Sequence, residues 1–175
     1  MRIKWFSLIR ITGLLLVLLY HFFQTIFPGG FFGVDVFFTF SGFLITSLLL
    51  EEFGKARQID LLGFFKRRFY RIVPPVVLMV LVTMPFTFLV RQDYVAGIGG
   101  QIAGVLGFMT NFYEMLTGGS YESQFIPHLF VHNWSLAVEV HYYILWGLAV
   151  WFLSKRSKSS SQLRGMVFLL SAGAF

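Results

Sequence analysis

Four long apolar runs constrain the fold of this chain more than any other feature. They occupy residues 6–27, 32–50, 74–90 and 134–152, and polar segments of varying length separate them. An α-helix needs about 20 largely apolar residues to cross the hydrocarbon core of a bilayer. The runs therefore predict an all-α protein, a polytopic transmembrane helix bundle. We treat residues 1–175 as one membrane domain.

The composition agrees with a membrane protein and argues against a nucleic-acid-binding one. Hydrophobic residues make up 57% of the chain and charged residues only 13%, whereas a soluble domain carries about 25% charged residues. The net charge of +6 comes mostly from Lys and Arg in the segments between apolar runs, where such residues set membrane orientation. Because the chain has no cysteine, disulfides, a thiolate nucleophile and a cysteine metal site are excluded.

The glycine-rich apolar segment at residues 95–112 leaves two topologies open. If it does not cross the membrane and the N-terminus is cytoplasmic, Arg91 is the only one of the 14 Lys and Arg residues outside. If it crosses, the four basic residues at 154–164 also move outside. The positive-inside rule therefore favours about four spans and a re-entrant or interfacial helix on the outer side. Residues 166–175 are apolar but too short to span, so we expect a truncated fifth span in the N-terminal part of a longer protein.

Two ionisable residues, Arg10 and His21, interrupt the first apolar run. Eleven residues separate them, which on a helix places them about 20° apart around the axis and roughly 16 Å apart along it. Ionisable groups inside a span usually face the protein interior and mark a functional path. This run therefore predicts a helix with two functional residues on one face, at two different depths in the membrane.

Two carboxylates are expected at the depth of His21. Asp35 lies near the outer end of the second apolar run, and Glu139 lies about one turn into the run that begins at Trp134. A carboxylate that orients an imidazole produces a general base, so we predict His21, Glu139 and Asp35 as catalytic residues. The alternative is that they are separate buried polar groups, each satisfied by a hydrogen bond between helices.

Arg68 and Arg71 are the candidate phosphate-binding residues. They are three residues apart, so on a helix they occupy neighbouring positions near the cytoplasmic surface, where planar guanidinium groups bind phosphate well. Anionic lipid headgroups are the alternative partner, and the spacing alone favours it. No metal site is predicted, because His128 and His132 lack the intervening glutamate of the metalloprotease pattern.

A different class of function, a proton- or ion-coupled transporter, uses the same intramembrane charged residues. Four motifs favour an enzyme instead. They are Arg10-x10-His21, PGGFFGVDVFFTFSGFLITSLLL at 28–50, RRFYRIVPP at 67–75 and HNWSLAVEVHYYILWG at 132–147. In this order they resemble the acyltransferase 3 family of integral membrane O-acyltransferases, and in appearance most resemble the peptidoglycan O-acetyltransferases of Gram-positive bacteria.

The resemblance implies an enzyme of the cell membrane that takes an acetyl group from cytoplasmic acetyl-CoA. The acceptor is expected to be a carbohydrate hydroxyl outside the cell, with a C-terminal or separate SGNH-type domain as a possible partner. Arg10, Arg68 and Arg71 would bind the donor, while His21 would act as base or transient acyl carrier. The chain departs from the family pattern at Val140, where a second carboxylate is common, and around Arg10, where the usual Gly-Leu-Arg-Ala run is missing.

Overall fold

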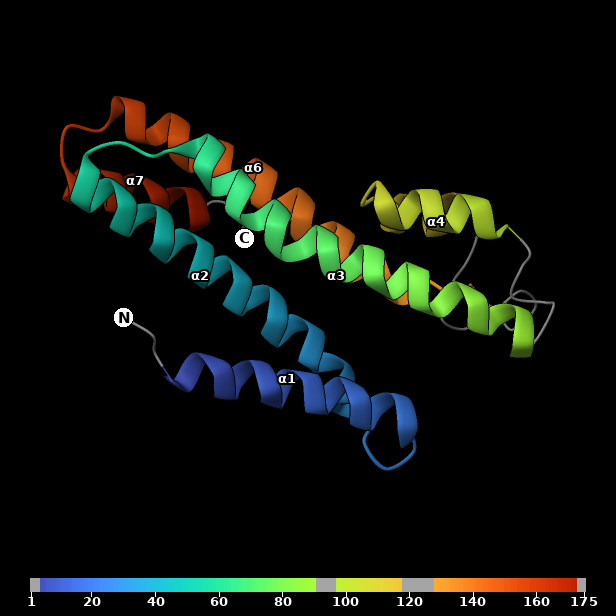
Figure 1. The fold of residues 1–175 in the computed structure, drawn as a ribbon. Helices are drawn as coiled ribbons and strands as arrows, with labels where there is room; N and C mark the ends of the chain where they lie inside the picture. The colour runs from blue at the N-terminus through green and yellow to red at the C-terminus, as the bar shows by residue number, and fades with distance from the viewer. Residues whose placement is uncertain (1–3, 91–96, 118–127, 173–175) are drawn as a thin grey trace. The chain divides into compact units, whose positions relative to one another are not determined.

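The computed structural model describes residues 4–90, 97–117 and 128–172, and every regular element in these ranges is helical (Figure 1). In chain order the elements are α1 (Lys4–Phe22), η1 (Pro28–Phe31), α2 (Phe32–Ala56), α3 (Leu61–Val90), α4 (Ile98–Leu106), α5 (Thr110–Thr117), η3 (Val131–Asn133), α6 (Trp134–Arg156) and α7 (Ser160–Ala172). The chain divides into two compact units. The first unit is Met1–Ile59 with Phe152–Phe175, and the second unit is Asp60–Trp151.

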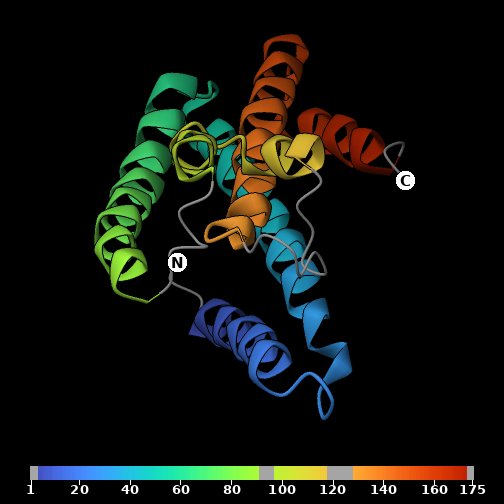
Figure 2. The ribbon, with the colours of Figure 1, turned by 90° about the vertical axis from the view of Figure 1, so that its right-hand side faces the viewer.

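In the first unit, α1 and α2 form an antiparallel pair joined through the short helix η1 (Figure 2). Glycine permits their close approach, because a Cβ atom at Gly33 would lie 2.5 Å from the carbonyl oxygen of Gly13. Gly30 is buried against Tyr20 in the same way. Small residues commonly bring membrane helices into close contact, and here they fix how α1 lies on α2.

In the second unit, α3 and α6 run antiparallel. Phe64 near the start of α3 lies against Gly147 of α6, and Met79 further along α3 contacts Asn133 just before α6 begins. The short helix α4 packs beside α3 (Figure 1). A buried apolar cluster joins these elements and consists of Val76, Val80, Val105 and Phe130.

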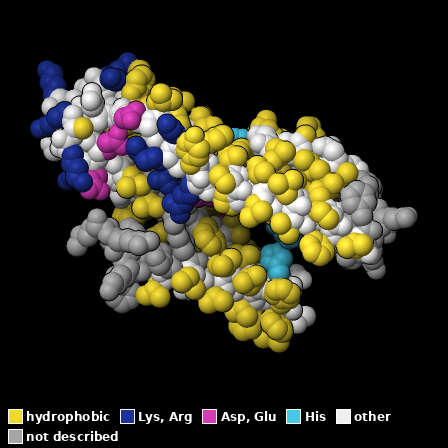
Figure 3. Space-filling view, in the orientation of Figure 1, with side chains coloured by type: hydrophobic (Ala, Val, Ile, Leu, Met, Phe, Trp, Pro, Cys, Tyr) yellow, Lys and Arg dark blue, Asp and Glu magenta, His cyan; other side chains and the backbone are white. Residues whose placement is uncertain are grey.

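The predicted membrane helix bundle is confirmed. Three helical stretches are long and apolar enough to span a bilayer, namely Pro28–Ala56, Leu61–Thr87 and Val131–Arg156, and α1 contains the shorter apolar stretch Ile11–Phe22. Figure 3 shows hydrophobic side chains over much of the visible face. This chain is therefore a multi-pass membrane protein.

Several helix boundaries differ from those expected. α1 ends at Phe22 rather than at residue 27, and α3 begins at Leu61 rather than at Pro74. Pro74 and Pro75 lie inside α3, so the carbonyls four residues earlier receive no helical N–H. Membrane helices tolerate such prolines because neighbouring groups satisfy the freed carbonyls. The basic segment before Pro74 is consequently helical.

The ambiguous segment at 95–112 contains no single long helix in its described part. α4 has 9 residues and is separated from α5 by a break at Gly107–Met109, where Phe108 has a positive φ of 54°. Nine residues rise only about 14 Å, roughly half the hydrocarbon thickness. The ring of Tyr113 on α5 lies so close to Gly100 of α4 that a Cβ there would come within 2.8 Å. The two short helices thus form a hairpin, α4–α5, of the kind expected for a re-entrant segment.

Candidate functional site

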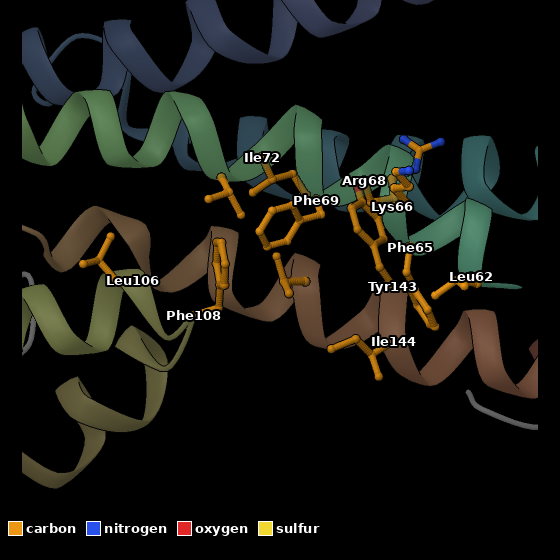
Figure 4. Close-up of a pocket in the computed structure, with 12 residues that line it drawn as sticks. Leu62, Phe65, Lys66, Arg68, Phe69, Ile72, Leu106, Phe108, Tyr143 and Ile144 are labelled. Atoms are coloured by element: carbon orange, nitrogen blue, oxygen red, sulfur yellow. The ribbon is translucent and has the colours of Figure 1, made fainter.

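The second unit contains an apolar cavity of about 830 Å³ with basic residues at one edge (Figure 4). Residues of α3, α6 and the α4–α5 break line it, among them Phe65, Phe69, Ile72, Leu106, Phe108, Val140 and Ile144. Lys66 and Arg68 are its two basic residues. Small-molecule sites typically measure about 300–1,000 Å³ and are mostly apolar with a few polar groups, so both the size and the lining fit a ligand site.

Arg68 is held among aromatic rings rather than extended into solvent. Its guanidinium carbon lies 5.6 Å from the ring centroid of Phe64 and 5.8 Å from that of Tyr143. A cation at this distance from an aromatic face is attracted by the ring quadrupole. Arg71, one turn further along α3, is exposed and does not line the cavity. The two arginines therefore share a helix but occupy different environments.

Glu139 lies within α6, close to this cavity. Its carboxylate accepts a hydrogen bond from the hydroxyl of Tyr143, one turn later on the same helix. Tyr143 is 7% exposed and lines the cavity beside Arg68. Tyr143 therefore contacts both Glu139, through its hydroxyl, and Arg68, through its ring.

His21 occupies the last turn of α1 and is exposed. Its Nδ1 atom lies 2.8 Å from the carbonyl oxygen of Val17. A carbonyl only accepts hydrogen bonds, so Nδ1 carries the proton and the neutral ring has its lone pair on Nε2. This is the tautomer in which Nε2 can take a proton from a reactant. Arg10 lies on the same helix, and its side chain is outside the described part of the structure.

Asp35 is an exposed residue in the first turn of α2. It follows Gly33, which faces α1, by two residues, so it points about 200° away around the helix. His21 and Asp35 belong to the first unit, whereas Glu139, Arg68 and Arg71 belong to the second. The hydrogen bond that orients His21 is thus the one its Nδ1 donates to the Val17 carbonyl. The role of Asp35 as a catalytic residue stays a prediction.

Sequence reasoning missed three features of these sites. Tyr143 was detectable, because it follows Glu139 by four residues and such pairs meet on one helix face. The apolar cavity depends on how α3, α4 and α6 pack, which no local pattern encodes. The third is a contact between Glu114 and His128, whose Oε2 and Nδ1 atoms lie 2.6 Å apart. Fourteen residues separate Glu114 and His128, so helical spacing does not predict their contact.

In the described residues, no group of three or more His, Cys, Asp and Glu side chains is placed to hold a metal ion. The chemical groups that remain are imidazoles, carboxylates, arginines and an apolar cavity within a helical membrane domain. This combination fits acid–base chemistry on a ligand that carries both an anionic and an apolar part. The class is that of a membrane-embedded helical protein with an apolar cavity among its helices.

Comparison with known proteins identifies the family. Residues 3–174 match the model of the acyltransferase 3 family, described as an acyltransferase domain. The chain belongs to this family, as its four motifs predicted. No solved structure matches it.

Two relatives come from Staphylococcus aureus. The O-acetyltransferase OatA of strain NCTC 8325 / PS 47 is 33% identical over 167 residues, which cover 94% of this chain and 28% of OatA. A putative O-acetyltransferase of strain COL is 35% identical over 136 residues, covering 78% of this chain and 22% of the relative. The chain thus spans less than a third of the length of these relatives.

Proposed function

We propose that this chain is part of a membrane O-acetyltransferase that moves an acetyl group from cytoplasmic acetyl-CoA to a carbohydrate hydroxyl outside the cell, in peptidoglycan. Family membership and the names of both relatives support O-acetyl transfer. The single structural observation that carries the donor assignment is the apolar cavity with Arg68 at its edge.

The cavity fits the two chemical halves of the donor. Acetyl-CoA supplies an acetyl group activated as a thioester, at the end of a long arm that begins at phosphates. Arg68 and Lys66 provide positive charge at one edge of the cavity, and exposed Arg71 adds to it one turn away. Guanidinium groups bind phosphate oxygens in pairs of hydrogen bonds. The aromatic lining receives the less polar arm and keeps water from it.

Acid–base chemistry is assigned to His21. With Nδ1 bonded to the Val17 carbonyl, its Nε2 accepts a proton from the attacking hydroxyl or carries the acetyl group for a time. Glu139 is the assigned carboxylate, held by Tyr143, and Asp35 is the second candidate. Arg10 belongs to the donor side because it lies roughly 16 Å along α1 from His21.

The direction of transfer rests on charge placement. With a cytoplasmic N-terminus, the Lys and Arg residues of the α2–α3 region lie inside, as the positive-inside rule requires. Acetyl-CoA is then met at the cytoplasmic side. The acceptor glycan is met from outside, where an SGNH-type domain, if the full-length protein has one, would complete the transfer.

Arg68 tests the donor assignment. In the full-length protein, purified in detergent, we expect Arg68→Ala to raise the KM for acetyl-CoA roughly tenfold or more, since a hydrogen bond to a charged group contributes about 1.5–3 kcal/mol. Arg68→Lys keeps the charge but loses the planar contacts of the guanidinium. Its KM for acetyl-CoA should therefore lie between those of the wild type and Arg68→Ala. Steady-state release of CoA thiol, with a disaccharide-peptide acceptor, measures both.

Arg164→Ala is the matched control, because it removes an exposed arginine from α7, far along the chain from the cavity. Its KM should equal that of the wild type. An unchanged KM for acetyl-CoA in Arg68→Ala would contradict the assignment of this cavity as the donor site. Binding of another part of the full-length protein over Phe69 and Leu106, detected by cross-linking, would do the same.

A further inference from the structure

A buried carboxylate–imidazole pair joins the α4–α5 hairpin to the segment before α6. Nδ1 of His128 lies 2.6 Å from Oε2 of Glu114, and both side chains are about nine-tenths buried. Because a carboxylate accepts hydrogen bonds, Nδ1 carries the proton and neutral His128 has its lone pair on Nε2. This is the arrangement predicted from sequence for His21, and the structure shows it at a different histidine.

The helix that carries Glu114 also presents unusual buried oxygen atoms. Within the described part of the chain, Thr110 Oγ1, Asn111 Oδ1 and Glu114 Oε1 are buried without a hydrogen-bond partner. Thr110 is only 2% exposed. Thr110 and Glu114, four residues apart, lie on one face of α5. Most buried polar atoms are hydrogen-bonded, so unpartnered oxygens on the helix that orients His128 are exceptional.

This cluster lies away from the basic edge of the cavity within the second unit. The chain just after His128 contacts α3 at Met79, through Asn133, and Met79 follows Arg68 by eleven residues. That separation corresponds to roughly 16 Å along the helix. The cavity extends toward the hairpin, because Leu106 and Phe108 line its end opposite the guanidinium (Figure 4). Two residues after Phe108, α5 begins with Thr110.

We propose that His128, held by Glu114, is a second acid–base site of this protein. His21 serves the transfer of the acetyl group from the thioester to a relay hydroxyl, and His128 deprotonates the hydroxyl of the carbohydrate acceptor that receives the acetyl group next. The proposal rests on the proposed O-acetyl transfer and assigns its acceptor half. The acceptor site then lies at the end of the second unit remote from Arg68, where the donor's anionic groups bind.

The chemical step is balanced without any oxidant or metal. The acceptor's hydroxyl proton passes to Nε2 of His128 while its oxygen bonds to the acetyl carbonyl carbon. The bond from that carbon to the group delivering it, an ester oxygen or thioester sulfur, breaks. The imidazolium returns its proton to that oxygen or sulfur. Glu114 keeps the Nδ1–H bond throughout and stabilises the transient positive charge.

A purely structural latch explains the pair less well. A hydrogen bond from a neutral imidazole to a carboxylate contributes only about 1.5–3 kcal/mol, and burial of the carboxylate costs free energy in return. A catalytic site accounts for a buried carboxylate that fixes the tautomer of one imidazole.

The test separates the two halves of the reaction in the full-length protein, purified in detergent. The probes are acetyl-CoA and a soluble disaccharide fragment of peptidoglycan. We expect His128→Gln to lower formation of acetylated disaccharide by about 100-fold or more, the range for a lost general base, with acetyl-CoA binding unchanged. Glu114→Gln should lower the same rate and leave donor binding intact. Met115→Gln is the control, because it changes a residue next to Glu114 on α5 that is 77% exposed.

Two results would overturn the assignment of His128. One is wild-type transfer by His128→Gln. The other is a joint loss of donor binding, transfer and thermal stability in both variants, which is the signature of a latch. If the wild-type protein itself acetylates no disaccharide, the proposed function fails first, so the two failures are distinguishable.

Discussion

The hydroxyl of Tyr143 donates a hydrogen bond to the carboxylate of Glu139, while the guanidinium of Arg68 lies 5.8 Å from the centroid of the same phenol ring. One buried side chain therefore contacts the residue assigned to donor binding and a carboxylate assigned to the chemistry. The hydroxyl and the ring of Tyr143 serve these two contacts separately. Substitutions can remove them one at a time.

Tyr143→Phe removes the hydroxyl and keeps the ring. Because Glu139 loses a hydrogen bond to its charged group, with a value of about 1.5–3 kcal/mol, we expect kcat for acetyl transfer to fall roughly tenfold. The KM for acetyl-CoA should stay near the wild-type value. Steady-state kinetics of the purified full-length protein provides both constants.

Tyr143→Ala also removes the ring and should raise the KM as well, since a desolvated cation–π contact contributes up to about 2 kcal/mol. Tyr142→Phe is the control, because Tyr142 stacks on Trp146 and does not line the cavity. Equal effects of Tyr143→Phe and Tyr143→Ala would show that the hydroxyl and the ring do not act separately.

The contact between α1 and α2 predicts a stability difference between two glycines of one helix. Gly33→Ala would place a Cβ atom 2.5 Å from the Gly13 carbonyl oxygen and 2.8 Å from a methyl group of Val17. Because both neighbours lie on a packed helix, we expect the free energy of unfolding to fall by about 1–3 kcal/mol, which is typical of overpacking. The midpoint of thermal unfolding in mild detergent measures it.

Gly54→Ala is the matched control for this prediction. Gly54 is exposed on the same helix, and nothing lies within 4 Å of a Cβ added there. Alanine has the higher helix propensity, so the variant should be as stable as the wild type or more stable by up to about 1 kcal/mol. Equal unfolding midpoints for the two variants would contradict the close helix contact.

The sequence predicted those parts of the fold that depend on composition along the chain. The starts of α2 at Phe32 and of α6 at Trp134 follow directly from where the apolar runs begin. The start of α3 was missed because Pro74 usually marks a helix boundary, whereas here the helix continues through it. Membrane helices relax this local rule, and sequence alone does not show where.

The candidate site also has residues that the sequence predicted and an arrangement that it did not. Arg68 and Arg71 look equivalent in sequence, and only the register of α3 on α6 places Arg68 beside Tyr143 and leaves Arg71 exposed. The pairing of Glu114 with His128 depends on how α5 packs against the segment that leads into α6. Contacts between helices decide both features, and helix periodicity contains no information on them.

The absence of cysteine from the chain allows a direct test of topology. Met115 on α5 is 77% exposed, and Lys158 lies exposed between α6 and α7. If residues 95–112 do not cross the membrane, Met115→Cys should react with an impermeant maleimide in intact cells. Lys158→Cys should react only after the membrane is opened. With a cytoplasmic N-terminus, the reverse pattern would mean that the segment crosses.

Nδ1 of His21 donates a hydrogen bond to the Val17 carbonyl, and removal of the imidazole tests the catalytic role proposed for this residue. His21 is exposed, so His21→Ala removes little packing and should insert into the membrane normally. Acetyl transfer should nevertheless fall by about 100-fold or more, because a general base or acyl carrier is lost. Acetate released by mild base from isolated cell walls provides the measurement.

Gln24→Ala is the control, since Gln24 is an exposed polar residue three positions after His21. It should show wild-type acetate. Normal cell-wall acetate in His21→Ala, at equal membrane abundance, would exclude both roles of this residue and leave His128 as the histidine to assign. Loss of acetate in both variants would instead indicate that the end of α1 matters for its shape rather than for the imidazole.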